Sequence, residues 1–205
     1  MKLNLGCGFR KLPGWVNVDV STACAPDQVA DIERIPWPWP SDYANHVLLS
    51  HVLEHLGESR GRYLAIMKEL WRVCAPDARV SIIVPHPRHD SFLGDPTHVR
   101  PITADGLALF DRARNARWIA AGAGNTPLGL VLGIDFALEE TRHRLDRRWR
   151  ARLDSGALTR EEITEAIRTH ANVVQETRME LRAVKPLRPV PNAREVTTSP
   201  PGHGA

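Results

Sequence analysis

The residues best suited to chemistry lie between Pro85 and Pro101. Three histidines, two aspartates and two arginines fall within the fifteen residues from His86 to Arg100. An imidazole with its ordinary pKa of about 6.5 can take a proton from a hydroxyl near neutral pH. A carboxylate can orient that imidazole, and a guanidinium can anchor an acidic substrate. We therefore predict a substrate site here, with His86, His89 and His98 as candidate bases, Asp90 or Asp95 as orienting carboxylate, and Arg88 and Arg100 as substrate anchors.

A glycine turn near the start of the chain could bind a nucleoside. Gly6-Cys7-Gly8 follows the apolar segment Leu3-Asn4-Leu5, and Asp19 closes a second apolar run eleven residues further on. Glycine lets the main chain turn tightly and approach a ligand without a Cβ in between. A carboxylate at the tip of the next strand can accept hydrogen bonds from both ribose hydroxyls. The pattern predicts the opening of a nucleotide-binding α/β domain.

The same turn departs from the dinucleotide fingerprint. Lys11 stands where the third small residue of G-x-G-x-x-G is required for close packing around a pyrophosphate. This argues against NAD and in favour of a nucleoside ligand without a phosphate. S-adenosylmethionine is such a ligand.

Five segments together resemble the class I S-adenosylmethionine-dependent methyltransferases, and among them the small type-11-like enzymes. They span about half of the chain in the order of that family: Leu3 to Gly8, Gly14 to Asp19, Ala30-Asp31-Ile32 before Ile35-Pro36-Trp37, Leu49 to Leu56, and Leu70 to Pro76. The resemblance implies a Rossmann-like, doubly wound α/β sheet that is mostly parallel and has an antiparallel last strand. It also implies S-adenosylmethionine as the cofactor.

The resemblance assigns roles to individual residues. Gly6 and Gly8 would pass under the methionine part, Asp19 would hold the ribose, Asp31 and Ile32 would frame the adenine, and Ser50 or His51 would close the pocket. The family usually has an acidic residue at the position of Asn4, where it meets the amino group of the cofactor. Asn keeps the hydrogen bonds but loses the charge, so we expect weaker binding rather than none. The chain also starts at the first strand, without the helix that often covers the cofactor, so we expect a more open pocket or a cover from another segment or subunit.

Two segments of the sequence could instead bind a metal ion. The imidazoles and carboxylates of His86 to Arg100 together suit several divalent ions, but their spacing does not decide for a metal. The run from His51 to His55 fits the H-x-x-E-H signature of inverted zinc peptidases, in which helical spacing places both histidines on one face. This run directly follows a strand of the methyltransferase-like framework, however, and the sequence Leu-Glu-His is common at that position of the family. We therefore predict no metal ligands.

The elements that must position these residues alternate between strand and helix. Apolar, β-branched segments predict strands at Lys2 to Leu5, Trp15 to Val20, Val29 to Ile32, Asn45 to Ser50 and Arg79 to Pro85. Apolar residues at helical spacing predict a helix from about Ser59 to Cys74. Such alternation is typical of a parallel sheet with helices on its faces. Ligands bind such sheets at the carboxyl ends of the strands, where the candidate residues fall.

The second half of the chain is less regular. We predict a helix over Ala104 to Arg117, a small-residue loop over Ala120 to Gly133, a sixth strand over Leu130 to Arg144, a helix over Thr159 to His170, and a last strand over Asn172 to Val184. Thr159 and Glu162 form a capping-box pattern. The predicted organisation is one domain over 1–185, with a helical insertion at about 146–170, and a disordered proline-rich tail over 186–205.

Composition limits the class of protein. The chain has 205 residues, a net charge of +3 and an isoelectric point near 9.0, which is well short of a dedicated nucleic-acid binder. Three cysteines without metal spacing indicate a reduced, cytoplasmic setting. No apolar run has the length of a membrane span or of a signal peptide. Six arginines from Arg142 to Arg152 are interrupted by acidic residues, which favours a solvated helix face or a contact within a homo-oligomer over a nucleic-acid surface.

The predicted function is methyl transfer from S-adenosylmethionine to a small molecule or to a carbohydrate-like hydroxyl such as a glycan precursor. Small enzymes that share the Gly-Trp-x-Asn-Val-Asp second strand are often associated with surface-glycan synthesis. One alternative is a nucleic-acid or protein methyltransferase, which the absence of an Asn-Pro-Pro-Tyr-like motif disfavours. Another is a non-catalytic subunit that binds the cofactor, which Asn4 favours.

Overall fold

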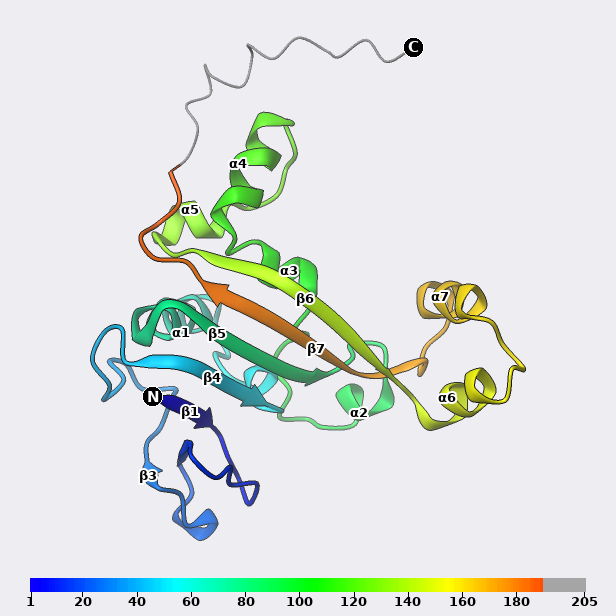
Figure 1. Ribbon diagram of the computed structural model, residues 1–205, viewed down its shortest axis with the longest axis horizontal. Coiled ribbons are helices and arrows are strands. Elements are labelled where there is room, and N and C mark those ends of the chain that lie inside the picture. Colours follow the sequence, from blue (N-terminus) through cyan, green and yellow to red (C-terminus); the bar gives the residue numbers. More distant parts are fainter. Residues whose placement is uncertain (190–205) are drawn as a thin grey trace.

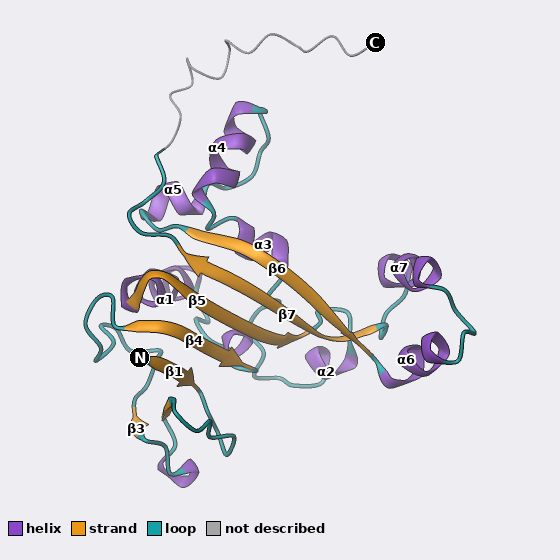
Figure 2. Cartoon of the chain, viewed as in Figure 1, coloured by secondary structure: helices purple, strands orange, loops and turns teal. Residues whose placement is uncertain are grey.

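The computed structural model describes residues 1–189 and contains one seven-stranded sheet (Figures 1 and 2). Its strands lie in the order β3-β2-β1-β4-β5-β7-β6. Their bounds are β1 (Lys2–Leu5), β2 (Val16–Asp19), β3 (Gln28–Val29), β4 (Ala44–Ser50), β5 (Cys74–Pro85), β6 (Phe136–Leu145) and β7 (Val174–Ala183). The pairs from β3 to β5 are parallel, and β7 is antiparallel to both β5 and β6. This confirms the predicted Rossmann-like sheet with an antiparallel last strand.

Helices and short turns fill the connections. The α-helices are α1 (Arg60–Val73), α2 (Asp90–Leu93), α3 (Ala104–Ala108), α4 (Arg112–Ala120), α5 (Leu128–Leu132), α6 (Arg147–Asp154) and α7 (Arg160–Thr169). Two 3-10 turns, η1 (Thr22–Cys24) and η2 (Leu53–His55), follow β2 and β4. Figure 1 shows α4 and α5 at one end of the β6–β7 pair and α6 and α7 at the other. No helix within residues 1–189 is long and apolar enough to cross a bilayer.

One face of the sheet carries the core. Alternate strand residues such as Leu3, Val47, Ile82 and Leu181 are fully buried, and they pack with apolar residues of α1 and α3. The opposite face is polar: Ser81 donates its one hydroxyl proton to Glu180 at 2.6 Å, so its oxygen accepts from Nε2 of His46 at 2.9 Å.

The best-formed helices have the expected end signals. Ser59 accepts a hydrogen bond from the backbone N–H of Arg62 at the start of α1. Thr159 and Glu162 exchange the two bonds of a capping box at the start of α7. Each cap satisfies backbone donors that the first helical turn leaves free.

The region between β5 and β6 differs from the prediction. The single helix predicted over Ala104 to Arg117 is wrong: Asp111 interrupts it and accepts a hydrogen bond from Arg114 N–H as the N-cap of α4. The loop predicted over Ala120 to Gly133 contains α5, which ends at Gly133 in the left-handed conformation. Strand β6 therefore begins at Phe136 instead of Leu130. The cap at Asp111 and the turn at Gly133 set these boundaries, and the residue composition on which the predictions were based does not show them.

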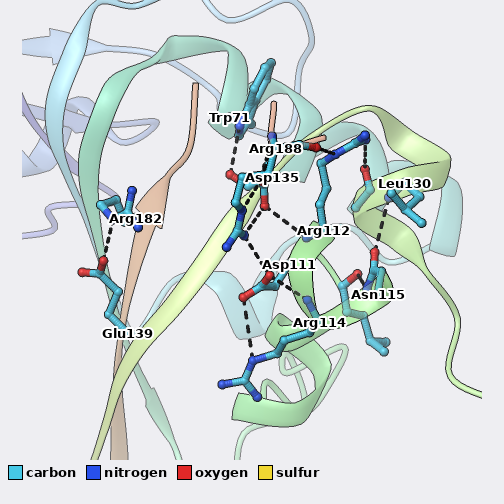
Figure 3. Close-up of polar contacts among 12 residues, drawn as sticks. Trp71, Asp111, Arg112, Arg114, Asn115, Leu130, Asp135, Glu139, Arg182 and Arg188 are labelled. Atoms are coloured by element: carbon cyan, nitrogen blue, oxygen red, sulfur yellow. Dashed lines mark hydrogen bonds and ion pairs between the residues drawn. The ribbon is translucent and has the colours of Figure 1, made fainter. Parts of the chain in front are cut away.

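Arg188 ties the segment after β7 to the body of the domain (Figure 3). Its guanidinium contacts the carboxylates of Asp135 at 2.5 Å and of Asp111 at 2.8 Å. Both aspartates are buried, and Asp135 also accepts the backbone N–H of Arg112. These contacts involve a residue of the predicted tail (186–205), and residues 190–205 of that tail lie outside the described residues.

Candidate functional site

A cavity of about 300 Å³ opens at the carboxyl ends of the parallel strands. Its walls come from the turn after β1, the end of β2, the segment after β3 and the segment after β4. The lining residues are Gly6, Asp19, Val20, Ala30, Asp31, Ile32, Glu33, His51, Val52, His55 and Leu56. Five of the eight residues predicted to bind the cofactor therefore lie around one cavity, at the edge where open α/β sheets bind ligands.

The glycine turn is closely packed against the segment after β4. Gly6 has a φ of +64°, and a Cβ at this position would lie 2.5 Å from Cγ2 of Val52. Gly8 has a φ of +49°, and its N–H donates to Oδ2 of Asp19 at 2.8 Å. A glycine at position 6 is therefore required both by the backbone conformation and by the close approach of the neighbouring segment.

Asp19 stands at the tip of β2 on the rim of the cavity. Its Oδ2 accepts from Gly8 N–H and its Oδ1 accepts from Ser21 N–H at 2.9 Å. A carboxylate has about four acceptor positions, so these two bonds fix its orientation and leave acceptor capacity on both oxygens. The side chain can therefore accept two further hydrogen bonds from a diol.

Asn4 lies behind the turn. Its buried side-chain amide donates to the backbone carbonyl of Arg10 at 3.1 Å and to Oδ1 of Asn17 at 2.9 Å. Asn17 in turn accepts from Leu12 N–H at 2.7 Å. Asn4 thus holds the shape of the loop between β1 and β2, and its predicted contact with the cofactor stays a prediction.

The opposite wall is formed by the segment after β3. Oδ1 of Asp31 accepts from Glu33 N–H at 2.9 Å, which forms a tight turn. The carbonyl of Ile32 accepts from Nε1 of Trp37 at 2.9 Å, and the Ile32 side chain is buried against the cavity. Glu33, which the sequence analysis did not select, accepts from Gly57 N–H at 2.6 Å and joins this wall to the segment after η2.

His51 closes the cavity at the end of β4. It is one of the few non-glycine residues here with a positive φ, at 56°, and its N–H donates to the carbonyl of Ile83. Its Nε2 lies 3.0 Å from Oε2 of Glu176 on β7. The preceding residue, Ser50, pairs with Ile83 in the sheet. A non-glycine residue in the left-handed region is strained, and such strained residues are common at functional positions. His51 is therefore a candidate functional residue.

A buried carboxylate lies beneath His51. Glu54 is fully buried, and neither of its carboxylate oxygens has a hydrogen-bond partner among the described residues. Its Oε1 lies 3.6 Å from Nδ1 of His51, and burial raises the pKa of Glu54. The neighbouring His55 and His98 rings lie 4.6 Å apart between centroids. Sequence analysis did not select Glu54 and His55, although the H-x-x-E-H run contained them.

The three predicted bases occupy three different environments. His98 lies beside His55, which lines the cavity. His89 accepts from Ser91 N–H as the N-cap of α2, and its Nε2 lies 3.6 Å from Asp146. His86 meets His143 of β6 edge to face at 6.0 Å. Asp90 is exposed at the start of α2, where its N–H donates to Asn172. The structure brings His98 toward the cavity and gives His89 a structural contact with α6.

The two predicted anchors are engaged by main-chain carbonyls. The guanidinium of Arg88 donates to the carbonyls of Ile167 and Arg168 at the end of α7. The guanidinium of Arg100 donates to the carbonyls of Leu56 and Gly57 and lies 4.2 Å from the ring centroid of Tyr63. These contacts give both arginines a structural role, and their role as substrate anchors stays a prediction.

His86 is expected to make the fold sensitive to acid. Burial, with smaller contributions from His143, Arg88 and His89, lowers the pKa of His86 from 6.5 to about 4. As the pH falls below 6.5, the unfolded chain takes up a proton that the folded protein does not take up until about pH 4. The free energy of unfolding therefore decreases over this interval. We expect His86→Gln to lose less stability than the wild type between pH 7 and pH 5, measured by urea unfolding.

The exposed His170 provides a matched control for this measurement. His170→Gln is expected to follow the wild-type dependence on pH. Equal pH dependence of His86→Gln and the wild type would contradict the burial of a neutral imidazole at position 86.

Comparison with known proteins identifies the fold. No protein-family model matches the chain, and no curated protein matches it. A S-adenosylmethionine-dependent methyltransferase from Archaeoglobus fulgidus is similar in structure, with a TM-score of 0.60, 17% identity, and 88% of this chain and 85% of that chain covered. One from Methanosarcina mazei gives a TM-score of 0.51 at 11% identity, with 89% and 92% covered. The [4+2]-cyclase SpnF is similar with a TM-score of 0.50 and 13% identity, and the match covers 89% of this chain and 75% of that chain.

Proposed function

We propose that this chain, which has the class I methyltransferase fold, transfers a methyl group from S-adenosylmethionine to a hydroxyl of a small molecule or a glycan precursor. The observation that carries the proposal is the position of Asp19. Its carboxylate is fixed by two backbone N–H groups at the rim of the cavity and keeps acceptor capacity for a ribose diol. The methyltransferases among the structures of similar fold agree with this proposal.

Different residues around the cavity would contact different parts of the cofactor. Asp19 would accept hydrogen bonds from the two ribose hydroxyls. The buried Ile32 would pack against the adenine, with Asp31 beside it. Gly6 would let the methionine part pass close to the main chain. His51 and Ser50 would bound the site toward the acceptor.

Methyl transfer occurs directly between cofactor and acceptor, so the protein itself forms few or no covalent bonds. The acceptor oxygen forms a bond to the methyl carbon while the bond from that carbon to the sulfonium breaks, and the sulfur keeps the electron pair. Alignment of donor and acceptor is the main contribution, worth about 7–11 kcal/mol in well-oriented model reactions. The acceptor proton must leave, and among the predicted bases His98 lies nearest the cavity through its contact with His55.

The alternatives make different predictions. A non-catalytic subunit would bind the cofactor without transferring its methyl group, and the fold allows other chemistry, as in the [4+2]-cyclase of similar fold. A nucleic-acid or protein methyltransferase would use the arginines of β6 and α6 as a docking surface. Several of them are engaged with acidic neighbours, such as Arg144 with Glu176 at 3.0 Å and Arg150 with Asp154 at 2.9 Å, which favours a small acceptor. We further propose a cytoplasmic protein that can act as a homo-oligomer.

The test combines binding with transfer. We expect the purified protein to bind S-adenosylhomocysteine with micromolar affinity in calorimetry. We also expect it to transfer radiolabelled methyl groups from S-adenosylmethionine to members of a panel of hydroxylated sugars and sugar nucleotides. Binding without transfer to sugars, nucleic acid or protein would favour the non-catalytic subunit. No binding at millimolar S-adenosylhomocysteine would overturn the proposal.

A further inference from the structure

We infer that Glu54, His55 and His98 form a binding site for one divalent transition-metal ion at the edge of the cavity. One ligand atom from each of the three side chains lies within 4.8 Å of the other two. A tetrahedral ion with bonds of about 2.1 Å holds its ligand atoms about 3.4 Å apart, so small side-chain rotations bring the three into range. The sequence analysis considered the H-x-x-E-H run and the 86–100 segment as two separate metal sites and predicted no ligands in either. The fold brings Glu54 and His55 of the first together with His98 of the second.

The carboxylate of Glu54 is the strongest indication of a missing partner. Its side chain is 1% exposed, and both oxygens are without a hydrogen bond among the described residues. A buried carboxylate without a partner is strongly destabilising, so buried charges in proteins are paired or coordinate metals. His51 is the nearest basic group, and its Nδ1 at 3.6 Å is too far for a hydrogen bond. A cation between Glu54 and the two imidazoles would satisfy this carboxylate.

The neighbours of the two histidines orient them as ligands. Thr97 donates its hydroxyl proton to Asp95 at 2.6 Å, so its oxygen accepts from Nδ1 of His55 at 3.0 Å. Nδ1 of His98 donates to the carbonyl of Phe92 at 2.7 Å. In each ring the proton is therefore on Nδ1, and Nε2 keeps the lone pair that binds a metal. Hydrogen bonds of this kind from the distal nitrogen are typical of metal-binding histidines.

The ligand types indicate which ion fits. Two imidazole nitrogens and one carboxylate oxygen suit first-row transition ions such as Zn²⁺, whereas Mg²⁺ and Ca²⁺ prefer all-oxygen sites. Three protein ligands leave at least one position open for water or substrate. The burial of Glu54 and the 7% exposure of the His98 side chain leave the side of His55, which lines the cavity, as the open side.

The consequence for catalysis rests on the proposed function. A hydroxyl acceptor that bound the ion in its open position would have a lowered pKa and would lie beside the cavity for the methyl donor. The metal would then take over the task that the sequence analysis gave to a general base, and His98 would act as a ligand. An acceptor with two adjacent oxygens, as in a sugar, could bind the ion through both.

The test measures metal binding in the absence of cofactor and acceptor. Protein freed of metal by a chelator is titrated with Zn²⁺ alone in competition with a chromophoric chelator. We expect one Zn²⁺ per chain, at least 10-fold weaker binding for Glu54→Gln and for His98→Gln, and no change for His170→Gln. Thr97→Val, which keeps all three ligands but removes the hydrogen bond to His55, should weaken binding about 10-fold. Absorption of the Co²⁺-substituted protein should lack sulfur-to-cobalt bands, which excludes the three cysteines as ligands.

Each outcome bears on the inference. Equal Zn²⁺ affinity of the wild type and the folded Glu54→Gln and His98→Gln variants, or no binding by the wild type, would overturn it. Because the titration contains no S-adenosylhomocysteine, Zn²⁺ binding by a chain that does not bind that nucleoside would support the metal site and reject the proposed function. The reverse result would reject only the metal site.

Discussion

Asp19→Ala is expected to weaken the binding of S-adenosylhomocysteine at least about 100-fold. The variant removes the two acceptor oxygens that would hold the ribose hydroxyls, and a hydrogen bond to a charged group contributes about 1.5–3 kcal/mol. Two such bonds correspond to about 3–6 kcal/mol, or a factor of about 150 to 20,000 in the dissociation constant. The variant also frees the N–H groups of Gly8 and Ser21, which the carboxylate now orders. Calorimetric titration of wild type and variant measures the difference.

Two further variants separate loss of the ribose contact from loss of the turn. Asp19→Asn keeps one side-chain oxygen as an acceptor, so we expect an intermediate loss of affinity. Asp27 also supports β2, because its Oδ2 accepts from the backbone and side-chain nitrogens of Asn17, but it is not among the residues that line the cavity. Asp27→Asn is expected to lower the melting temperature with less than a 3-fold effect on affinity. An Asp19→Ala variant that binds as tightly as the wild type would remove the ribose assignment.

The parallel half of the sheet could be predicted because its signals are local. Alternation of buried and partly exposed residues in β4 and the β-branched run of β5 identify strands without any knowledge of their partners. The cap of α1 at Ser59 and the capping box of α7 can likewise be predicted from four consecutive residues. The residues from 104 to 135 were harder to predict, because Asp111 and Gly133 divide a broadly apolar stretch into short helices. Those boundaries depend on caps whose partners lie in the fold.

The candidate site shows the same limit. Gly6, Asp19, Asp31, Ile32 and His51 follow strand ends, so sequence order alone predicts that they converge. The residues of the 86–100 segment were grouped by their closeness in the chain, and the fold places the three histidines in different environments. Asp95 stays beside His98, with 3.8 Å between its Oδ2 and Nε2 of His98. His86 packs toward β6, and His89 contacts Asp146 before α6. His98 stacks on Phe92, and its ring lies tilted against that of His55. Glu33 carries no local signal beyond its charge. Glu54 belongs to the H-x-x-E-H run, but its burial and the approach of His98 depend on the fold.

Arg188→Met is expected to lower the free energy of unfolding by about 3–5 kcal/mol. Arg188 donates to Asp135 through its backbone N–H, Nε and Nη2, and to Asp111 through Nη2 (Figure 3). The Asp135 side chain is fully buried and that of Asp111 is 7% exposed. Removing the guanidinium leaves the buried carboxylate of Asp135 without its cation and leaves Asp111 with Arg114 alone, whose Nε lies 3.7 Å from Oδ2 of Asp111. Breaking a buried ion pair on one side costs about this much. Urea unfolding of the full chain measures the change.

Arg182 provides the matched control, because it pairs with Glu139 and Asp77, whose side chains are 50% and 70% exposed. Arg182→Met should cost less than about 1 kcal/mol, since exposed pairs contribute little. If the large effect at position 188 comes from an unpaired buried charge, the double variant Arg188→Met with Asp135→Asn should be more stable than Arg188→Met alone, because the unpaired charge of Asp135 is gone. If the effect came only from lost packing of the segment after β7, Asp135→Asn would give no recovery. Equal costs at positions 188 and 182 would mean that Arg188 does not anchor the end of the domain.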